Sequence, residues 1–190
     1  MGSVSGFDRE SSEVVLADET RWKFDYLVVA TGSTHHYFGK DAQWEHLAPG
    51  LKTIEDATKI RRNVLLAFER AERSSDPEEI KRLLTFVVVG GGPTGVEMAG
   101  SIAELAKQTM RRDFRSIDPT QARVILVENS QHVLDRYHHS LSIRAAKDLL
   151  NMGIELRNET RLAEIHPDHV VVTSKGVSSI IETENVVWAA

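Results

Sequence analysis

Continuous apolar runs alternate along this chain with segments in which apolar residues recur every three or four positions. Three of the runs, at residues 86–89, 123–128 and 185–190, are rich in β-branched side chains. Such runs are typical of strands that are covered on both faces of a parallel sheet. A shorter run at residues 154–157 predicts a further strand of the same kind.

The spacing of three and four residues predicts helices. One begins at Thr53 and has apolar residues on one face and arginines on the other. A short helix at residues 78–83 follows it. Another opens at Pro93, directly after three glycines, and runs to about Met110. Residues 141–152 predict the last helix.

Short strands separated by turns precede and follow these elements. Residues 13–17 and 21–24 predict a hairpin that leads into a buried strand at residues 26–30. Residues 33–51 have no period and predict a loop. Three short runs between residues 161 and 182 predict an antiparallel meander. The sequence therefore predicts an α/β fold, a Rossmann-like parallel sheet with helices on both faces plus an antiparallel three-strand meander.

Composition is that of an ordinary globular protein, and it argues against several classes of function. Hydrophobic residues make up 41% of the 190 residues, charged residues 27%, and the formal net charge is −5. A negative charge without a basic stripe argues against a nucleic-acid partner. The absence of cysteine excludes thiolate metal sites and a thiol redox centre within these residues. No apolar run approaches the roughly 18 residues of a membrane span, so a soluble chain is expected.

The glycines after the first apolar run are the main candidate for a binding site. They have the G-x-G-x-x-G spacing of a dinucleotide-binding turn and lie between a predicted strand and a predicted helix. In that motif the glycines permit a tight turn, close approach of a pyrophosphate and close helix packing, and the helix N-terminus attracts the anion. A purely structural glycine turn is the alternative. The predicted cofactor-binding residues of the turn are Gly90, Gly91, Gly92, Pro93, Thr94 and Gly95.

Glu128 closes the second apolar run, where a dinucleotide fold places an acid against the adenosine ribose hydroxyls. A carboxylate at this position favours NAD(H), because it repels the 2′-phosphate of NADP(H). Glu128 lies farther beyond Gly95 than the roughly 20 residues usual for the motif. The polar segment 111–121 accounts for the additional residues between Gly95 and Glu128 without moving the strand end. Outside a dinucleotide fold, Glu128 would be an ordinary acid at a strand end.

Other polar residues give weaker signals. Glu97 lies in the first turn after the glycines, where an acid is favourable near the positive end of the helix dipole. It could instead contact a nicotinamide ring, and the sequence leaves both possibilities open. The adjacent pairs His35–His36 and His138–His139 do not have a metal-ligand spacing, since neighbouring residues do not share a helix face. No metal site is predicted.

Four segments carry a family resemblance, and they occur in the expected order. They are YLVVATG at residues 26–32, HYFGKDAQWEHLAPGLKTIEDATKIRR at 36–62, FVVVGGGPTGVEMAG at 86–100 and the final NVVWAA. Together they resemble type II NADH dehydrogenase. This is the single-chain, non-proton-pumping NADH:quinone oxidoreductase of the FAD/NAD(P)-binding pyridine nucleotide-disulfide oxidoreductase superfamily.

The resemblance implies a domain organisation. Residues 1–32 would be a remnant of an FAD-binding domain, residues 33–185 an NAD(H)-binding domain, and residues 186–190 a truncated strand that returns to the FAD domain. Members of the family also have an N-terminal glycine turn for FAD, a later flavin motif and a C-terminal amphipathic membrane anchor. None of these is in the sequence, so we expect a fragment of a longer enzyme.

The resemblance also implies an activity for that longer enzyme. It would transfer a hydride from NADH to FAD and then reduce a quinone, as a peripheral protein on the cytoplasmic side of the inner membrane. The fragment, which has no FAD site, would bind NADH without turnover. Exposed edges of the FAD-domain remnant could also pair two chains as a homodimer that has no physiological meaning.

Roles for individual residues follow from the same resemblance. The glycine turn and Glu128 would hold NADH, and Glu97 would face the nicotinamide as the candidate catalytic residue. Ala30, Thr31 and Gly32 would lie at the domain junction near the flavin.

Two other functions remain open at this point. One is the NADH-binding domain of a related flavoprotein, such as a ferredoxin or rubredoxin reductase or an NADH oxidase, because these share the ATG and G-x-G-x-x-G motifs. The other is a nucleotide-binding regulatory module with no redox role.

Overall fold

The parallel sheet predicted from the apolar runs is present in the computed structural model, which describes residues 2–110 and 112–190. Its strands are β4 (Thr85–Val89), β5 (Arg123–Val127), β6 (Glu155–Arg157) and β10 (Asn185–Trp188). They lie in the order β10-β4-β5-β6, and all neighbours are parallel. Every residue of β4 is buried, as expected for a strand that is covered on both faces.

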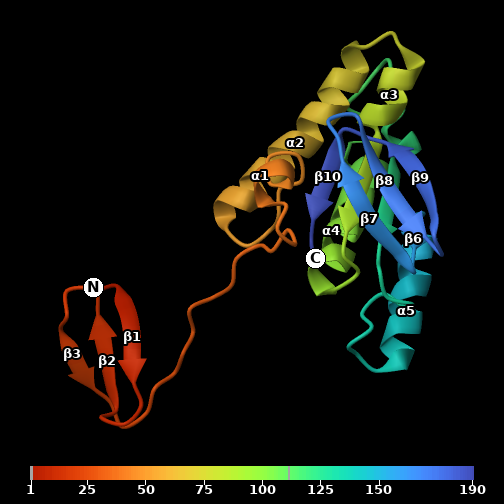
Figure 1. The fold of residues 1–190 in the computed structure, drawn as a ribbon. Coiled ribbons are helices and arrows are strands. Elements are labelled where there is room, and N and C mark those ends of the chain that lie inside the picture. Colours follow the sequence, from red (N-terminus) through yellow and green to blue (C-terminus); the bar gives the residue numbers. More distant parts are fainter. Residues whose placement is uncertain (1, 111) are drawn as a thin grey trace. The chain divides into compact units, whose positions relative to one another are not determined.

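The longer helices all pack on one face of this sheet (Figure 1). They are α2 (Ile54–Arg73), α3 (Pro77–Leu83), α4 (Pro93–Glu104) and α5 (His139–Asn151). The strand residues that meet them are alternate positions of β4 and β5 together with one residue of β10: Phe86, Val88, Val124, Leu126 and Val187. This buried cluster is the larger of the two cores and holds α4 against the sheet.

The opposite face of the sheet is covered mainly by strands. β7 (Thr160–Ile165), β8 (His169–Ser174) and β9 (Val177–Glu182) form the predicted antiparallel meander, and Val87, Val89, Ile125 and Val127 pack in the core beneath it. The one-turn helix α1 (Asp41–Trp44), in a segment predicted as loop, adds Trp44 to this core. The predicted α/β fold with its meander is confirmed, but the helices are distributed unequally between the two faces.

The predicted buried strand at residues 26–30 is wrong. The described residues divide into two compact units, one up to Ser33 and one from Thr34 to Ala190. The first consists of the antiparallel strands β1 (Val4–Asp8), β2 (Glu13–Leu16) and β3 (Arg21–Lys23), and residues 26–33 after them have no helix or strand. Tyr26 is 94% exposed and Val28 is 85% exposed. An apolar run becomes a buried strand only when a neighbouring strand pairs with it, and no described strand does so here.

The predicted helix after the glycines reaches Met110 through a change of geometry. Regular α-helix ends at Glu104, and Leu105–Thr109 form a π-helical turn in which the Met110 N–H donates to the Leu105 carbonyl. Arg111, the first residue of the polar segment predicted before β5, lies outside the described residues.

Helix α2 begins where the sequence predicts, because Thr53 and Asp56 form a capping box. The Asp56 N–H donates to Thr53 Oγ1 at 3.1 Å, and the Thr53 N–H donates to Asp56 Oδ2 at 3.0 Å. The Lys52 N–H and His35 Nε2 also contact Asp56 Oδ2, at 3.0 and 3.1 Å. These hydrogen bonds, chiefly those from Thr53 and Lys52, lower the pKa of Asp56 to about 2.

We predict that Asp56→Asn lowers the free energy of unfolding at pH 7 by about 1 kcal/mol, since the capping box loses its carboxylate. The lowered pKa means that this stabilisation is complete above the ordinary value of 3.8 and is lost as the pH falls through about 2. Urea unfolding followed by circular dichroism at pH 7 and pH 2 measures both effects. Glu55→Gln, at an exposed acid of the same helical turn, is the matched control. Equal stability of the wild type and Asp56→Asn at pH 7 would contradict this assignment.

The turn between β4 and α4 is closed by two glycines that lie against each other. A Cβ atom on Gly95 would be 1.8 Å from the Gly90 carbonyl oxygen, and one on Gly90 would be 2.7 Å from the carbonyl carbon of Ala189. Gly90 also has a φ of +108°, a backbone angle that residues with a side chain rarely adopt. Neither position tolerates a side chain, so α4 starts in direct backbone contact with the end of β4.

We predict that Gly95→Ala destabilises the protein by about 2 kcal/mol or more, because the added methyl group must push α4 away from the turn. Gly100→Ala, on the same helix, is the control, and we expect it to raise the free energy of unfolding. Its Cβ would meet only the methyl carbon of Met152, at 3.8 Å, and alanine is the better helix former by up to about 1 kcal/mol. Thermal and urea unfolding compare the two variants, and similar stabilities would show that the close contact is unimportant.

Candidate functional site

The glycine turn leaves the carboxyl end of β4 and forms the N-terminus of α4. Gly92 is the N-cap residue, has no side chain to cap the first N–H groups, and is followed by Pro93 at the first helical position. A Cβ atom on Gly92 would meet no atom within 4 Å. Open space therefore lies beside an uncapped helix N-terminus, the arrangement that binds an anion such as a pyrophosphate.

The carboxylate of Glu128 lies against this turn from the end of β5. Its Oε2 accepts a short hydrogen bond from the Gly91 N–H, and its Oε1 accepts one from the Ser130 N–H at 2.6 Å. A Cβ on Gly91 would be only 2.8 Å from Oε2, so the glycine permits this approach. A carboxylate has about four acceptor positions, which leaves two for the hydroxyls of a bound ribose.

The order of the strands aligns the predicted residues along one edge of the sheet. Glu128 follows β5, the glycine turn follows β4, and Ala189 and Ala190 follow β10, which is the other neighbour of β4. The Ala189 N–H donates to the Val89 carbonyl at 2.8 Å, so the end of β10 is fixed beside the turn. Ligands of open α/β sheets bind at this carboxyl edge, where the strand order reverses.

A cavity of about 450 Å³ opens at the same edge, on the side of the meander. Gly90 and Glu128 form part of its wall. The remaining wall includes aromatic and cationic residues that sequence reasoning did not identify as functional: Phe38, Lys40, Trp44, Arg161 and Trp188. They come from α1, β7, β10 and the segment before α1, so no local motif could have identified them.

Lys40 connects two sides of this cavity. Its Nζ donates to the Ala163 carbonyl of β7 at 3.1 Å and lies 4.4 Å from the centre of the Trp44 ring. The Ala163 carbonyl is available at an irregularity in the pairing of β7 with β8, between Leu162 and Glu164. This hydrogen bond of Lys40 therefore holds the segment before α1 against the meander.

The cavity wall does not include every predicted site residue. Glu97 is exposed on α4 and is not part of the cavity wall. Ala30, Thr31 and Gly32 belong to the first unit and are exposed. A separate cavity of about 180 Å³ lies between α2 and β10 and includes none of the predicted site residues.

Within residues 2–110 and 112–190, no group of three or more His, Asp or Glu side chains is arranged to hold a metal ion. His35 contacts Asp56, and His138 accepts from the Ser140 N–H at the start of α5. No helix in the described part of the chain combines the length and the apolar character needed to cross a bilayer.

Comparison with known proteins agrees with the resemblance drawn from the motifs. The chain is 43% identical over 194 aligned residues to the type II NADH:quinone oxidoreductase Ndh of Mycobacterium tuberculosis, with all of this chain and 42% of that protein covered. It thus spans less than half the length of that relative. NDH2 of Plasmodium falciparum, solved in complex with NADH, has the same fold, with a TM-score of 0.79 and 21% identity over 95% of this chain and 38% of NDH2.

A more distant structure has a related fold. The ferredoxin reductase of Rhodopseudomonas palustris gives a TM-score of 0.65 at 20% identity, covering 98% of this chain and 39% of that protein. The family model of the pyridine nucleotide-disulphide oxidoreductases matches residues 1–190. The chain therefore belongs to the pyridine nucleotide-disulphide oxidoreductase family.

Proposed function

We propose that this chain is the NADH-binding part of a type II NADH:quinone oxidoreductase. The observation that carries the proposal is the open position beside Gly92 at the uncapped start of α4, with the carboxylate of Glu128 at the next strand end. These features suit the two chemically distinct parts of an adenosine pyrophosphate, namely the anion and the ribose hydroxyls. The mycobacterial type II NADH:quinone oxidoreductase, which is 43% identical to this chain, supports the choice of NADH and quinone as substrates.

Each residue at the edge has a binding task in this proposal. The N–H groups at the start of α4 hold the pyrophosphate, and the absence of a side chain on Gly92 lets it approach. Glu128 accepts from the adenosine ribose while it keeps the Gly91 and Ser130 N–H groups in place. The remaining half of the dinucleotide then extends towards the end of β10.

The complete enzyme extends the proposal beyond these residues. Residues 1–32 would belong to an FAD-binding domain, and Ala30, Thr31 and Gly32 would lie near the flavin. The NADH domain would begin at residue 33 and include β10, since this strand pairs with β4 in the parallel sheet. Glu97 would face the nicotinamide in that assembly. Nicotinamide and flavin supply the redox chemistry, with a quinone as the final acceptor, and the protein orients the rings. Peripheral attachment to the cytoplasmic side of a membrane belongs to the same proposal. A homodimer would instead arise from exposed sheet edges of the isolated chain.

Gly92→Ala separates binding from folding. The added methyl group meets no protein atom and Gly92 is extended, so the free energy of unfolding should change by less than about 0.5 kcal/mol. The same methyl group would occupy the space of the pyrophosphate, so the NADH affinity should fall by at least about tenfold. Titration of NADH fluorescence measures the affinity. Gly6→Ala, whose Cβ is equally unobstructed in the first unit, should bind like the wild type. An unchanged NADH affinity in Gly92→Ala would rule out a pyrophosphate at this turn.

Glu128 should make the chain select NADH over NADPH by about tenfold or more, because its charge repels a 2′-phosphate. Glu128→Gln should reduce the ratio of the NADH affinity to the NADPH affinity. It should also lower the thermal midpoint, because the amide NH₂ group must face one of the two backbone N–H groups that the carboxylate accepts. Parallel titrations with both nucleotides test this, with Glu104→Gln at an exposed acid of α4 as the control. Equal affinities of the wild type for NADH and NADPH would remove the role given to Glu128.

A further inference from the structure

Phe38 is the exposed member of an aromatic cluster at the carboxyl end of β10. The ring of Trp188 lies 5.0 Å from that of Tyr37, 5.6 Å from that of Trp44 and 6.1 Å from that of Phe38. Tyr37, Trp44 and Trp188 are at most 6% exposed, whereas Phe38 is 67% exposed. Phe38 also lines the cavity whose wall includes Gly90 and Glu128. Its ring is therefore open to a ligand, while the other rings of the cluster form its support.

The backbone holds Phe38 in a conformation that a bulky residue rarely adopts. Its φ is +54°, and the following Gly39 has a φ of +81°. Such strained residues persist only where the surrounding structure fixes them, and they are frequent at ligand sites. On one side the Tyr37 hydroxyl donates to the Ala48 carbonyl at 2.9 Å, and on the other Lys40 binds the Ala163 carbonyl. The two anchors keep the aromatic side chain of Phe38 at the cavity.

The order of the strands indicates which part of a dinucleotide would reach Phe38. Adenosine is assigned to Glu128 after β5, and the pyrophosphate to the glycine turn after β4. The next strand along the edge is β10, and its last residue, Trp188, contacts Phe38. A ligand that follows the edge in this direction brings its second, nicotinamide-bearing half to Phe38.

We propose that Phe38 is a positioning residue whose ring packs against the nicotinamide ring of the bound dinucleotide. This inference rests on the proposed function, since it takes the adenosine and pyrophosphate positions from it. An exposed phenylalanine offers a flat apolar face that suits a planar heteroaromatic ring. The buried cluster and Lys40 hold that face in place before the ligand arrives, which reduces the cost of ordering it on binding.

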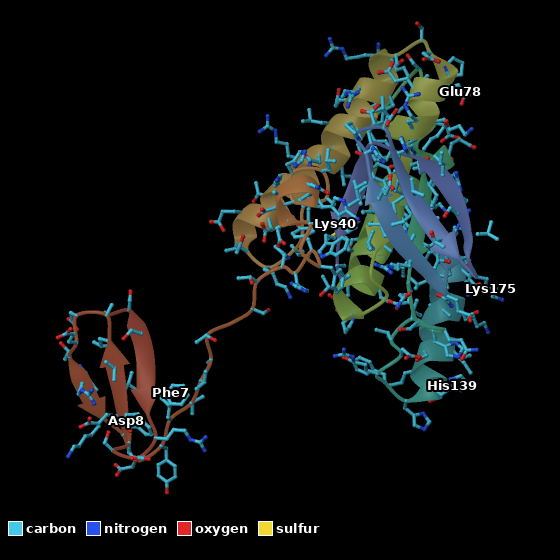
Figure 2. The ribbon with its side chains drawn as sticks, viewed as in Figure 1. Phe7, Asp8, Lys40, Glu78, His139 and Lys175 are labelled. Carbon is cyan, nitrogen blue, oxygen red and sulfur yellow. The ribbon has the colours of Figure 1, made fainter. Side chains whose placement is uncertain are left out.

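The test compares NADH with ADP-ribose, which has the adenosine and pyrophosphate but no nicotinamide. Calorimetric titration of the whole chain gives both dissociation constants for the wild type, Phe38→Leu and Phe38→Tyr. Phe38→Leu should weaken NADH binding by between about three- and tenfold and leave ADP-ribose binding unchanged. Phe38→Tyr keeps the aromatic face and should restore the NADH affinity. Phe7→Leu, at a 54% exposed phenylalanine of the first unit, is the matched control (Figure 2).

Each other outcome has a separate meaning. Unchanged NADH binding in Phe38→Leu overturns the role of Phe38 and leaves the proposed function intact. Equal weakening of NADH and ADP-ribose also overturns it, because Phe38 would then act on the adenosine half or on the fold. A wild-type chain that binds neither ligand contradicts the proposed function, and the role of Phe38 with it. Since Phe38 is exposed, thermal unfolding of Phe38→Leu should match the wild type and confirm that the variant is folded.

Discussion

The contact between Gly95 and the Gly90 carbonyl is the constraint on which the site depends. Any side chain at position 95 would overlap that carbonyl oxygen, so α4 can start directly above the end of β4 only if the residue is glycine. The same contact sets the N-terminus of α4 at the carboxyl edge, beside Glu128 on one side and the end of β10 on the other. A shift of the helix would therefore disturb the anion position and the carboxylate bridge together.

Sequence reasoning succeeded where local chemistry decides the structure. The apolar runs identified the strands of the parallel sheet, because a strand covered on both faces needs apolar side chains at every position. The start of α2 was predictable because Thr53 and Asp56 satisfy each other within one helical turn. The spacing of Gly90, Gly92 and Gly95 predicted the turn between a strand and a helix. Gly90 and Gly95 meet a local steric requirement there, whereas a Cβ atom on Gly92 would meet no protein atom.

It was wrong or incomplete where distant residues decide the outcome. The run at residues 26–30 has the composition of a strand, but strand formation depends on a neighbour that periodicity cannot reveal. The bond of Glu128 to the Gly91 N–H joins two separate strand ends, so the sequence indicated the acid but not its structural task. Phe38 and Lys40 could be recognised as cavity residues only from the structure, because the rest of the wall comes from distant strands such as β7 and β10. Helix α1 is one turn long, too short for a period.

In the proposed function, the carboxyl edge of the sheet is one continuous binding surface that runs from Glu128 through the glycine turn to the end of β10. Amide chemical shifts report directly on that surface, and a chain of 21.2 kDa suits two-dimensional ¹H–¹⁵N correlation spectra. On titration with NADH, we expect the largest shifts at Gly91, Gly92 and Ser130, with smaller shifts around Phe38. Shifts concentrated around the separate cavity between α2 and β10, or no shifts at saturating NADH, would contradict NADH binding at the carboxyl edge.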